Sequence, residues 1–327
     1  MQAQLIALDW GTTSLRAYRL GAEGRVLERR SLSAGIMQLP ATGSSSVSGF
    51  DLALEQAIGD WLQADPQLPV IACGMVGSAQ GWREAAYQST PASLHALSAA
   101  LTVVRSRRGH DVHIIPGVIQ ASVLPNVMRG EETQVLGVLE AWGQHAGPLL
   151  IGLPGSHSKW VRVEQGRIVH FDTFMTGEVY AALCAHTLLG RTMAPTTGFD
   201  EAAFDRGVAV ARAAEGVAGP LATIFSTRTL GLTGQLSGSA QVDYLSGLLV
   251  GHELAGLCAL LRAPDVPLPE VVLVGSDALC KRYQRALQVF QFPAVTLVEQ
   301  ATERGLWQVA RQAGLLTMRP ADLLKEL

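Results

Sequence analysis

Hydrophobic residues along this chain follow two patterns, one typical of short strands and one typical of helices. Near the N-terminus, three apolar segments separated by tight polar turns predict strands at Gln4–Asp9, Leu15–Leu20 and Val26–Leu32. Short apolar segments further along predict strands at Pro69–Cys73, Val112–Ile115, Val271–Val274 and Ala294–Val298. Longer segments with helical spacing of apolar residues predict helices, namely Phe50–Ala64, Leu94–Val104, Glu131–Trp142, Glu178–Leu189, Thr197–Glu215, Val242–Arg262, Ala278–Phe290 and Ala301–Gly314. This mixture predicts an α/β fold with mixed sheets.

One stretch of the pattern occurs twice. Leu5–Gly35 and Leu149–Gly177 both read as an apolar strand, a small hydroxyl-rich turn, a second strand, a glycine turn and a third strand. Aligning Gly11 with Gly155 brings the two hydroxyl-rich turns into register. A chain that builds this unit twice is expected to form two similar lobes, 1–130 and 131–327, with the last helix able to pack back toward the first. We expect the two turns to face each other across a cleft.

Composition narrows the class of protein. The 327 residues suffice for two domains, and the formal charge of −3 comes with no basic stripe, so binding to nucleic acid or to an acidic membrane is not expected. The four cysteines are scattered and lack metal spacing, which is typical of buried thiols in a reducing cytosol. The N-terminus has no signal-peptide pattern, and the apolar helix Val242–Arg262 is interrupted by polar residues and glycines, so we expect a cytoplasmic protein. The oligomeric state stays open, with a homodimer as one alternative.

The two hydroxyl-rich turns are candidates for phosphate binding. Exposed backbone N–H groups and hydroxyls donate well to phosphate oxygens. The predicted donors are Gly11, Thr12 and Thr13 in the first turn and Gly155, Ser156, His157, Ser158 and Lys159 in the second. Asp9 ends the strand before the first turn, and a carboxylate there would act through Mg²⁺ or its waters rather than on phosphate directly. The alternative is an ordinary hairpin turn without a ligand.

Two acidic residues open the helix between the two repeats. Glu131 or Glu132 is predicted to accept a proton from an attacking hydroxyl or to orient Mg²⁺. The alternative is that both simply complement the positive end of the helix dipole. The sequence does not choose between the two residues.

Two further loops are candidates for ligand binding. The glycine-rich loop that begins at Gly74 carries Ser78, Gln80 and Trp82, a mixture of polar groups and an apolar face that suits a polyol or a sugar acid, although an ordinary surface loop is the alternative. We expect Gly35 to lie near the same substrate. Gly275 and Ser276 follow an apolar strand and precede a helix, a place where small residues admit a base or a ribose.

The strings that carry these features resemble a known superfamily. DWGTTSLRAY and LPGSHSKWV resemble the two phosphate motifs of the actin, Hsp70 and sugar-kinase superfamily, RGEETQVLG its connecting helix, and VVLVGSDAL its adenosine motif. GMVGSAQGWREAAY, MRGEETQVLG, STRTLGLTGQLS and DYLSGLLVGHEL resemble the 2-keto-3-deoxygalactonokinase family more closely. Against that family's pattern, Ala79 stands where an Arg is common and Asn126 where an Asp is common.

The resemblance implies a fold and an activity. The implied fold has two ribonuclease-H-like lobes of the actin-like ATPase kind with a central nucleotide cleft. The implied reaction is transfer of a phosphoryl group from ATP, with Mg²⁺, to the terminal 6-hydroxyl of 2-dehydro-3-deoxy-D-galactonate in galactonate catabolism. An exopolyphosphatase-like phosphohydrolase of the same superfamily is the first alternative, and a non-enzymatic ATP-driven binding protein of the actin or Hsp70 kind is the second.

Overall fold

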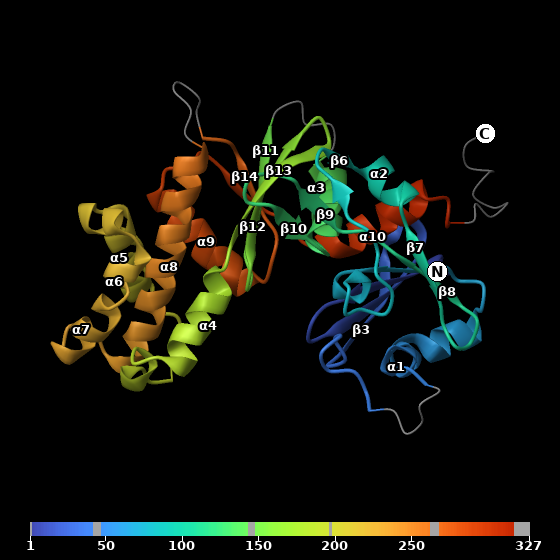
Figure 1. Ribbon diagram of the computed structural model, residues 1–327, viewed down its shortest axis with the longest axis horizontal. Helices are drawn as coiled ribbons and strands as arrows, with labels where there is room; N and C mark the ends of the chain where they lie inside the picture. Colours follow the sequence, from blue (N-terminus) through green and yellow to red (C-terminus); the bar gives the residue numbers. More distant parts are fainter. Residues whose placement is uncertain (1, 42–46, 143–147, 196–197, 262–267, 317–327) are drawn as a thin grey trace. The chain divides into compact units, whose positions relative to one another are not determined.

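The computed structural model describes residues 2–41, 47–142, 148–195, 198–261 and 268–316 (Figure 1). By their internal contacts they divide into two compact units. Unit 1 comprises Met1–Gly147, Val163–His170 and Gln300–Leu327, and unit 2 comprises Pro148–Arg162 and Phe171–Glu299. Unit 1 thus includes the helix that begins at Glu131. The functional boundary expected between residues 130 and 131 stays a prediction.

A six-stranded mixed sheet forms the centre of unit 1. Its order is β3-β2-β1-β4-β8-β7, from β1 (Leu5–Trp10), β2 (Leu15–Leu20), β3 (Val26–Leu32), β4 (Val70–Cys73), β7 (Thr102–Arg105) and β8 (Asp111–Ile114). Strands β1, β4 and β8 are parallel. Ile6, Leu8 and Trp10 join the core formed with helix α1 (Gly49–Ala64). Because side chains alternate along a strand, Asp9 points to the opposite face of the sheet.

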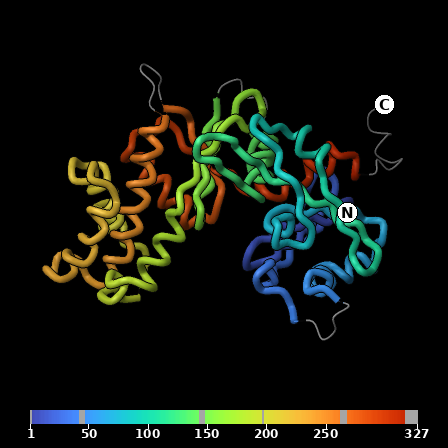
Figure 2. The backbone as a smooth tube through the Cα atoms, in the orientation of Figure 1, coloured from blue at the N-terminus to red at the C-terminus, as the bar shows by residue number. Residues whose placement is uncertain are grey.

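Two helices that are far apart in the sequence pack together in unit 1. They are α3 (Glu131–Trp142) and α10 (Ala301–Gln312), and α10 also contacts β1 and β4; Figure 2 shows the red C-terminal helix returning to this unit. Glycines make the contact close. A Cβ on Gly137 would lie 1.8 Å from the carbonyl oxygen of Ala301, and one on Gly305 would lie 1.9 Å from that of Thr133. Any larger residue at these positions would force the helices apart.

The expected helix Leu94–Val104 is wrong in its second half. Helix α2 covers Leu94–Ala99 only, and Thr102–Arg105 forms strand β7. β-Branched side chains such as Thr102 and Val103 favour a strand when a partner is available, and β8 supplies that partner through an antiparallel pairing. Four short strands were not predicted from the sequence, namely β5 (Gln88–Ser89), β6 (Ala92–Ser93), β9 (Val118–Gln120) and β10 (Asn126–Met128).

Unit 2 repeats the strand order of unit 1. The second six-stranded sheet lies mostly in this unit and is ordered β15-β14-β11-β12-β13-β6, where β11 is Leu149–Leu153, β12 Ser158–Glu164, β13 Arg167–Phe174, β14 Val271–Leu273 and β15 Val295–Leu297. The segment Val163–His170, at the turn between β12 and β13, belongs to unit 1. The meander β11-β12-β13 corresponds to β1-β2-β3, and β14 and β15 run parallel to β11 as β4 and β8 run parallel to β1. The prediction of two similar α/β lobes is therefore confirmed. The cleft expected between them stays a prediction.

Helices make up the rest of unit 2. They are α4 (Thr176–His186), α5 (Glu201–Arg212), α6 (Pro220–Thr223), α7 (Ser226–Leu232), α8 (Gly238–Leu261) and α9 (Asp277–Val289); α6 and α7 were not predicted, and positions 197 and 262 of the expected helices lie outside the described residues. By length and composition α8 could cross a membrane, but 61% of its most apolar window is buried. It packs against α4, α5 and α9, as expected of a core helix.

Candidate functional site

The first hydroxyl-rich turn is held from behind by the segment after β3. Gly11 N–H bonds the carbonyl of Ser14 at 2.9 Å, and the carbonyl of Gly11 accepts from Ile36 N–H at 3.1 Å. A Cβ on Gly35 would lie 2.4 Å from backbone atoms of Thr12, so only glycine allows this approach. Thr12 and Thr13 are exposed, whereas Gly35 is buried. The turn is therefore open to a ligand on its outer side, and Gly35 supports it. The substrate contact predicted for Gly35 stays a prediction.

Asp9 lies at the carboxyl end of β1, directly before this turn. Its Oδ2 accepts from Arg16 Nη1 at 3.0 Å, and its side chain is 19% exposed. Among the described residues, Oδ1 has no hydrogen-bond donor. Burial raises the pKa of Asp9, Arg16 lowers it, and Glu303 raises it further. A cation at Oδ1 would favour the ionised form, so this carboxylate fits one end of a Mg²⁺ site in which phosphate and water supply most ligands.

Two glycines bring the glycine-rich loop and the start of α3 next to Asp9. Gly74 follows β4, has φ 93°, and a Cβ there would lie 2.8 Å from the carbonyl oxygen of Trp10. Gly130 has φ 107°, and its own Cβ would lie 3.2 Å from Gly74 Cα. Both glycines adopt a backbone conformation that other residues disfavour. The ends of β1 and β4 and the first turn of α3 thus meet at one edge of the sheet.

The two acidic residues of α3 have different surroundings. Glu132 is completely buried, and its carboxyl accepts from Gly130 N–H at 2.6 Å and from Thr133 Oγ1 at 3.0 Å. Burial first and Glu131 second raise the pKa of Glu132 to about 8, so it is mostly protonated at neutral pH. Glu131 is only half-buried and accepts from Arg129 N–H at 3.0 Å. The geometry therefore favours Glu131 as the residue that a substrate or a hydrated metal can reach.

The glycine-rich loop places its predicted residues in different surroundings. Gln80 is exposed, but the Trp82 ring stacks on Phe50 with centroids 5.8 Å apart and packs edge-on against Trp10 at 5.9 Å. Trp82 thus belongs largely to the core of unit 1. Ser78 is buried, and its hydroxyl has no partner among the described residues. The substrate roles of these side chains and of Gly74 stay predictions.

Arg129 lies beside this loop and was not singled out in the sequence. Its guanidinium donates from Nη2 to the carbonyl of Ala85 at 2.8 Å and lies 4.3 Å from the centroid of the Tyr87 ring. The residue is buried, and Nε and Nη1 have no partner among the described residues. A Cβ on Gly77 would lie 3.0 Å from Nη1. In the sequence, the one feature that pointed to Arg129 was its position directly before Gly130 in the string MRGEE.

The second hydroxyl-rich turn is built like the first. A Cβ on Gly177, the last residue of the second repeat, would lie 2.4 Å from the carbonyl oxygen of Gly155 and 2.8 Å from Ser156 Cα. Glu178 N–H donates to the carbonyl of Ser156 at 3.0 Å. Gly177 therefore supports the second turn as Gly35 supports the first. Gly35 and Gly177 are the last residues of the two repeats, so the sequence already indicated that they correspond. Gly177 was nevertheless not predicted to belong to the site.

The side chains of the second turn point in different directions. Ser156 and His157 are exposed, and His157 Nε2 pairs with Glu178 Oε2. Ser158 and Lys159 are buried, and the Ser158 hydroxyl lies 3.0 Å from Tyr283 Oη. The Ser158 side chain thus faces the interior, because β12 begins at this residue and turns it into the core. Its predicted contact with phosphate, like that of Lys159, stays a prediction.

A cavity of about 330 Å³ adjoins the second turn within unit 2. Its wall includes Gly155, Ser156, Thr176 and Gly177 from the turn and the start of α4, and the side chains Tyr180, Leu249, Val250, Leu279, Arg282 and Tyr283 from the helices. Apolar walls with a few polar groups and a donor-rich turn at one end suit a nucleotide. A Cβ on Gly275 would lie 3.6 Å from the carbonyl oxygen of Pro154, and Ser276 is the N-cap of α9. These two predicted residues thus lie next to the second turn.

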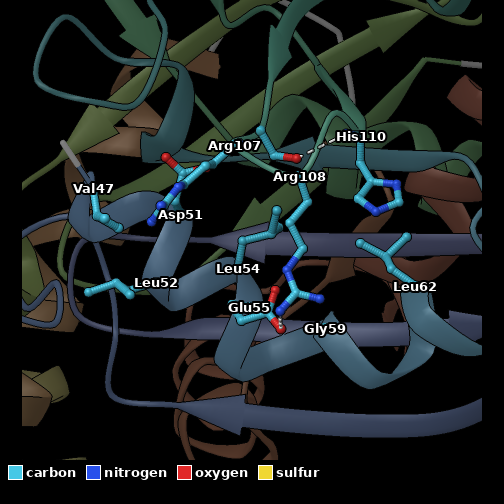
Figure 3. Close-up of a pocket in the computed structure, with 11 residues that line it drawn as sticks. Val47, Asp51, Leu52, Leu54, Glu55, Gly59, Leu62, Arg107, Arg108 and His110 are labelled. Atoms are coloured by element: carbon cyan, nitrogen blue, oxygen red, sulfur yellow. Dashed lines mark hydrogen bonds and ion pairs between the residues drawn. The ribbon is translucent and has the colours of Figure 1, made fainter.

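A second cavity, of about 380 Å³, lies in unit 1 between α1 and the turn that joins β7 to β8 (Figure 3). Arg108 Nη2 pairs with Glu55 Oε1 at 2.7 Å, and Arg107 N–H donates to Asp51 Oδ1 at 2.8 Å. The turn precedes β8, so the cavity is at the amino-terminal edge of the parallel strands. The predicted site residues follow the carboxyl-terminal ends of β1 and β4, where α/β folds bind ligands.

Comparison with known proteins gives the family. The model of the 2-keto-3-deoxy-galactonokinase family matches residues 9–309. "Probable 2-dehydro-3-deoxygalactonokinase DgoK1" of Rhizobium meliloti (strain 1021) is 38% identical over 287 residues, covering 86% of this chain and 88% of the relative. The 2-dehydro-3-deoxygalactonokinase of Escherichia coli (strain K12) is 34% identical over 291 residues, covering 88% and 90%.

A solved structure agrees with this result. The crystal structure of a Sinorhizobium meliloti protein assigned as a 2-dehydro-3-deoxygalactonokinase is 36% identical, with a TM-score of 0.82, and covers 94% of this chain and 98% of its own. This similarity confirms the actin-like sugar-kinase fold that the resemblance implied. The chain therefore belongs to the 2-keto-3-deoxy-galactonokinase family of sugar kinases.

Proposed function

We propose that the protein transfers the γ-phosphoryl group of ATP, bound with Mg²⁺, to the terminal 6-hydroxyl of 2-dehydro-3-deoxy-D-galactonate in cytoplasmic galactonate catabolism. The relatives that carry this enzyme name cover most of the chain. The observation that carries the proposal is the pair of glycine-supported hydroxyl-rich turns, one in each unit. Phosphoryl transfer depends mainly on positioning and charge neutralisation, and such turns supply both.

The proposed nucleotide site is the cavity of unit 2. The phosphates would contact backbone N–H groups of Gly155 and Ser156 and the N-terminus of α4, where the helix dipole favours negative charge. The base and ribose would lie against the apolar wall that includes Leu249 and Leu279. Because this wall is formed by α8 and α9, which pack on the same sheet as the turn, the cavity can position both ends of the nucleotide.

The proposed acid–base and metal chemistry belongs to unit 1. Asp9 and the turn Gly11–Thr13 would hold the metal-bound phosphates, and Glu131 would orient the acceptor hydroxyl and take up its proton. Mg²⁺, when bound with ATP, supplies charge neutralisation at the phosphates. Glu132 is buried and largely neutral, so its part is to fix the first turn of α3.

The acceptor is proposed to be an acid because of the surroundings of Arg129. A buried guanidinium with unpartnered nitrogens is costly, and Nε and Nη1 of Arg129 lack partners, as does the hydroxyl of Ser78 nearby in the loop. An anionic substrate bound at this loop would offset part of that cost. This supports a sugar acid over a neutral sugar.

A coupled ADP-release assay tests the proposal. Purified protein with MgATP is offered 2-dehydro-3-deoxy-D-galactonate, its stereoisomers and a neutral sugar of the same length. We expect ADP release that requires the sugar acid and a product phosphorylated at the terminal hydroxyl. Phosphate release without an acceptor would instead support the phosphohydrolase, and turnover of neutral sugars alone would refute the acid acceptor.

A further inference from the structure

A buried carboxyl group in unit 2 has no part in the reaction proposed above. Glu253 lies in the middle of α8 and is 3% exposed. Its Oε1 accepts from Trp160 Nε1 at 2.7 Å, and its Oε2 accepts from Tyr283 Oη at 2.7 Å and from Thr176 Oγ1. An acid in a protein core is costly unless donors surround it. The three donors come from β12, α4 and α9, so this carboxyl links three elements to α8. We call Glu253 and its three donors, Trp160, Thr176 and Tyr283, the junction.

The directions of these hydrogen bonds connect Glu253 to Ser158, a residue of the second hydroxyl-rich turn. A tyrosine hydroxyl has one proton, and Tyr283 gives it to Glu253. The 3.0 Å contact between Tyr283 Oη and Ser158 Oγ must then be donated by Ser158. Glu253 therefore influences how the Ser158 hydroxyl is turned, both through Tyr283 and through its own interaction with Ser158.

Two partners of Glu253 also form the wall of the cavity. Thr176 and Tyr283 both line it. Thr176 is the first residue of α4, and the next residue, Gly177, touches the backbone of Gly155 and Ser156. A hydrogen bond that holds Thr176 therefore holds the start of α4 against the second turn. Helix α8, which carries Glu253, contacts both α4 and α9, the helices that carry Thr176 and Tyr283 (Figure 1).

We propose that Glu253 is a positioning residue of the nucleotide site, which fixes Thr176, Tyr283 and Ser158 so that the second turn and the cavity wall are already arranged when a nucleotide binds. It does not touch the nucleotide itself. Pre-arranged groups bind more tightly because ordering them costs nothing at the moment of binding. The inference rests on the proposed function only in taking an adenine nucleotide as the occupant of the cavity.

The test compares two buried tyrosines, one that contacts Glu253 and one that does not. Tyr283 and Tyr244 are both buried in unit 2, and each hydroxyl is hydrogen-bonded to a serine, Ser158 in one case and Ser226 in the other. Tyr244 does not line the cavity. Tyr283→Phe and Tyr244→Phe each remove one buried tyrosine hydroxyl, but only Tyr283→Phe also takes a donor from Glu253, so the stability of both variants is measured alongside their binding. Glu253→Gln keeps the shape of the junction and changes its hydrogen bonding.

The dissociation constant for MgADP and for a non-hydrolysable ATP analogue is measured by calorimetry well below the melting temperature of each variant. We expect Glu253→Gln and Tyr283→Phe to weaken binding about five- to tenfold, the equivalent of one ordinary hydrogen bond, and Tyr244→Phe to change it less than about twofold. In the kinase assay, KM for ATP should rise while KM for the sugar acid stays unchanged.

Equal losses of affinity in Tyr283→Phe and Tyr244→Phe would overturn the proposal, since the effect would then follow stability alone. If Glu253→Gln does not fold, the comparison of the two tyrosine variants still decides. Binding is measured without an acceptor, so a wild-type protein that binds nucleotide but does not phosphorylate the sugar acid would refute the proposed function and leave this inference standing. A wild-type protein that binds no adenine nucleotide would refute the nucleotide site itself.

Discussion

The buried acid at the start of α3 makes a quantitative prediction about stability and pH. The pKa of Glu132 is raised from 4.5 to about 8 in the folded chain. Between these values the unfolded chain has released this proton and the folded chain has kept it. The contribution of Glu132 to the free energy of unfolding is therefore fully present below about pH 4.5 and is lost as the pH rises through 8. Between about pH 5 and 7, the group should lower the free energy of unfolding by roughly 1 to 1.4 kcal/mol per pH unit.

Glu132→Gln isolates this contribution. A glutamine amide resembles the protonated acid, so it can still accept from Gly130 N–H and can donate to Thr133 Oγ1, but it does not titrate. Urea unfolding is followed at several pH values by tryptophan fluorescence, which reports mainly on unit 1 because five of the six tryptophans lie there. We expect the variant to become more stable relative to wild type as pH rises from 5 to 8.

A control on the same helix makes the comparison specific. Glu140 lies in α3, is partly exposed and pairs with Arg304 at 3.1 Å. Glu140→Gln should keep the wild-type pH dependence, because an exposed ion pair contributes little. Parallel pH profiles for Glu132→Gln and wild type would show that Glu132 is already ionised at neutral pH, and would refute its assignment as a neutral helix cap.

Four further predictions concern activity. Glu131→Gln should lower kcat about a hundredfold or more if it takes up the proton, and wild-type turnover would exclude that role. Asp9→Asn should lower turnover by about two orders of magnitude or more and raise the Mg²⁺ requirement, with an unchanged circular-dichroism spectrum. Gly177→Ala should raise KM for ATP about tenfold or more through its clash with the second turn, whereas Gly198→Ala, with open space at its Cβ, should not. Arg129→Lys should lower kcat/KM for the sugar acid about tenfold, and an equal loss with a neutral sugar would show that Arg129 does not recognise the acid.

Much of the fold was readable from the chain because the signals were local. The strands Leu15–Leu20 and Val26–Leu32 and the helix Glu131–Trp142 have their predicted bounds, since alternation, turn glycines and acidic helix starts act over a few residues. The error at Thr102–Arg105 has the opposite cause. That segment is a strand because β8, further along the chain, pairs with it. The short strands β5 and β6 also pair with distant segments. Strands β9 and β10 pair with each other across a short loop, but each has only three residues, too few to show alternation.

The internal repeat was the strongest information in the sequence. Two copies of one apolar and polar pattern predicted two lobes with the same strand order, and the glycines that end the copies, Gly35 and Gly177, proved to support the two turns. The sequence could also propose Asp9 as a metal-linked acid, because its place at the end of a buried strand before a glycine is a local feature.

The sequence alone determined the class of the fold, the two phosphate-binding candidates and the acidic pair of α3, because each depends on neighbours along the chain. Only the tertiary structure separated Glu131 from Glu132, turned the Ser158 hydroxyl inward and brought Glu253 to Tyr283 and Thr176. Burial and hydrogen bonding between distant elements decide such matters, since they set which side chain meets solvent and which proton has a partner. No local pattern of residues contains that information.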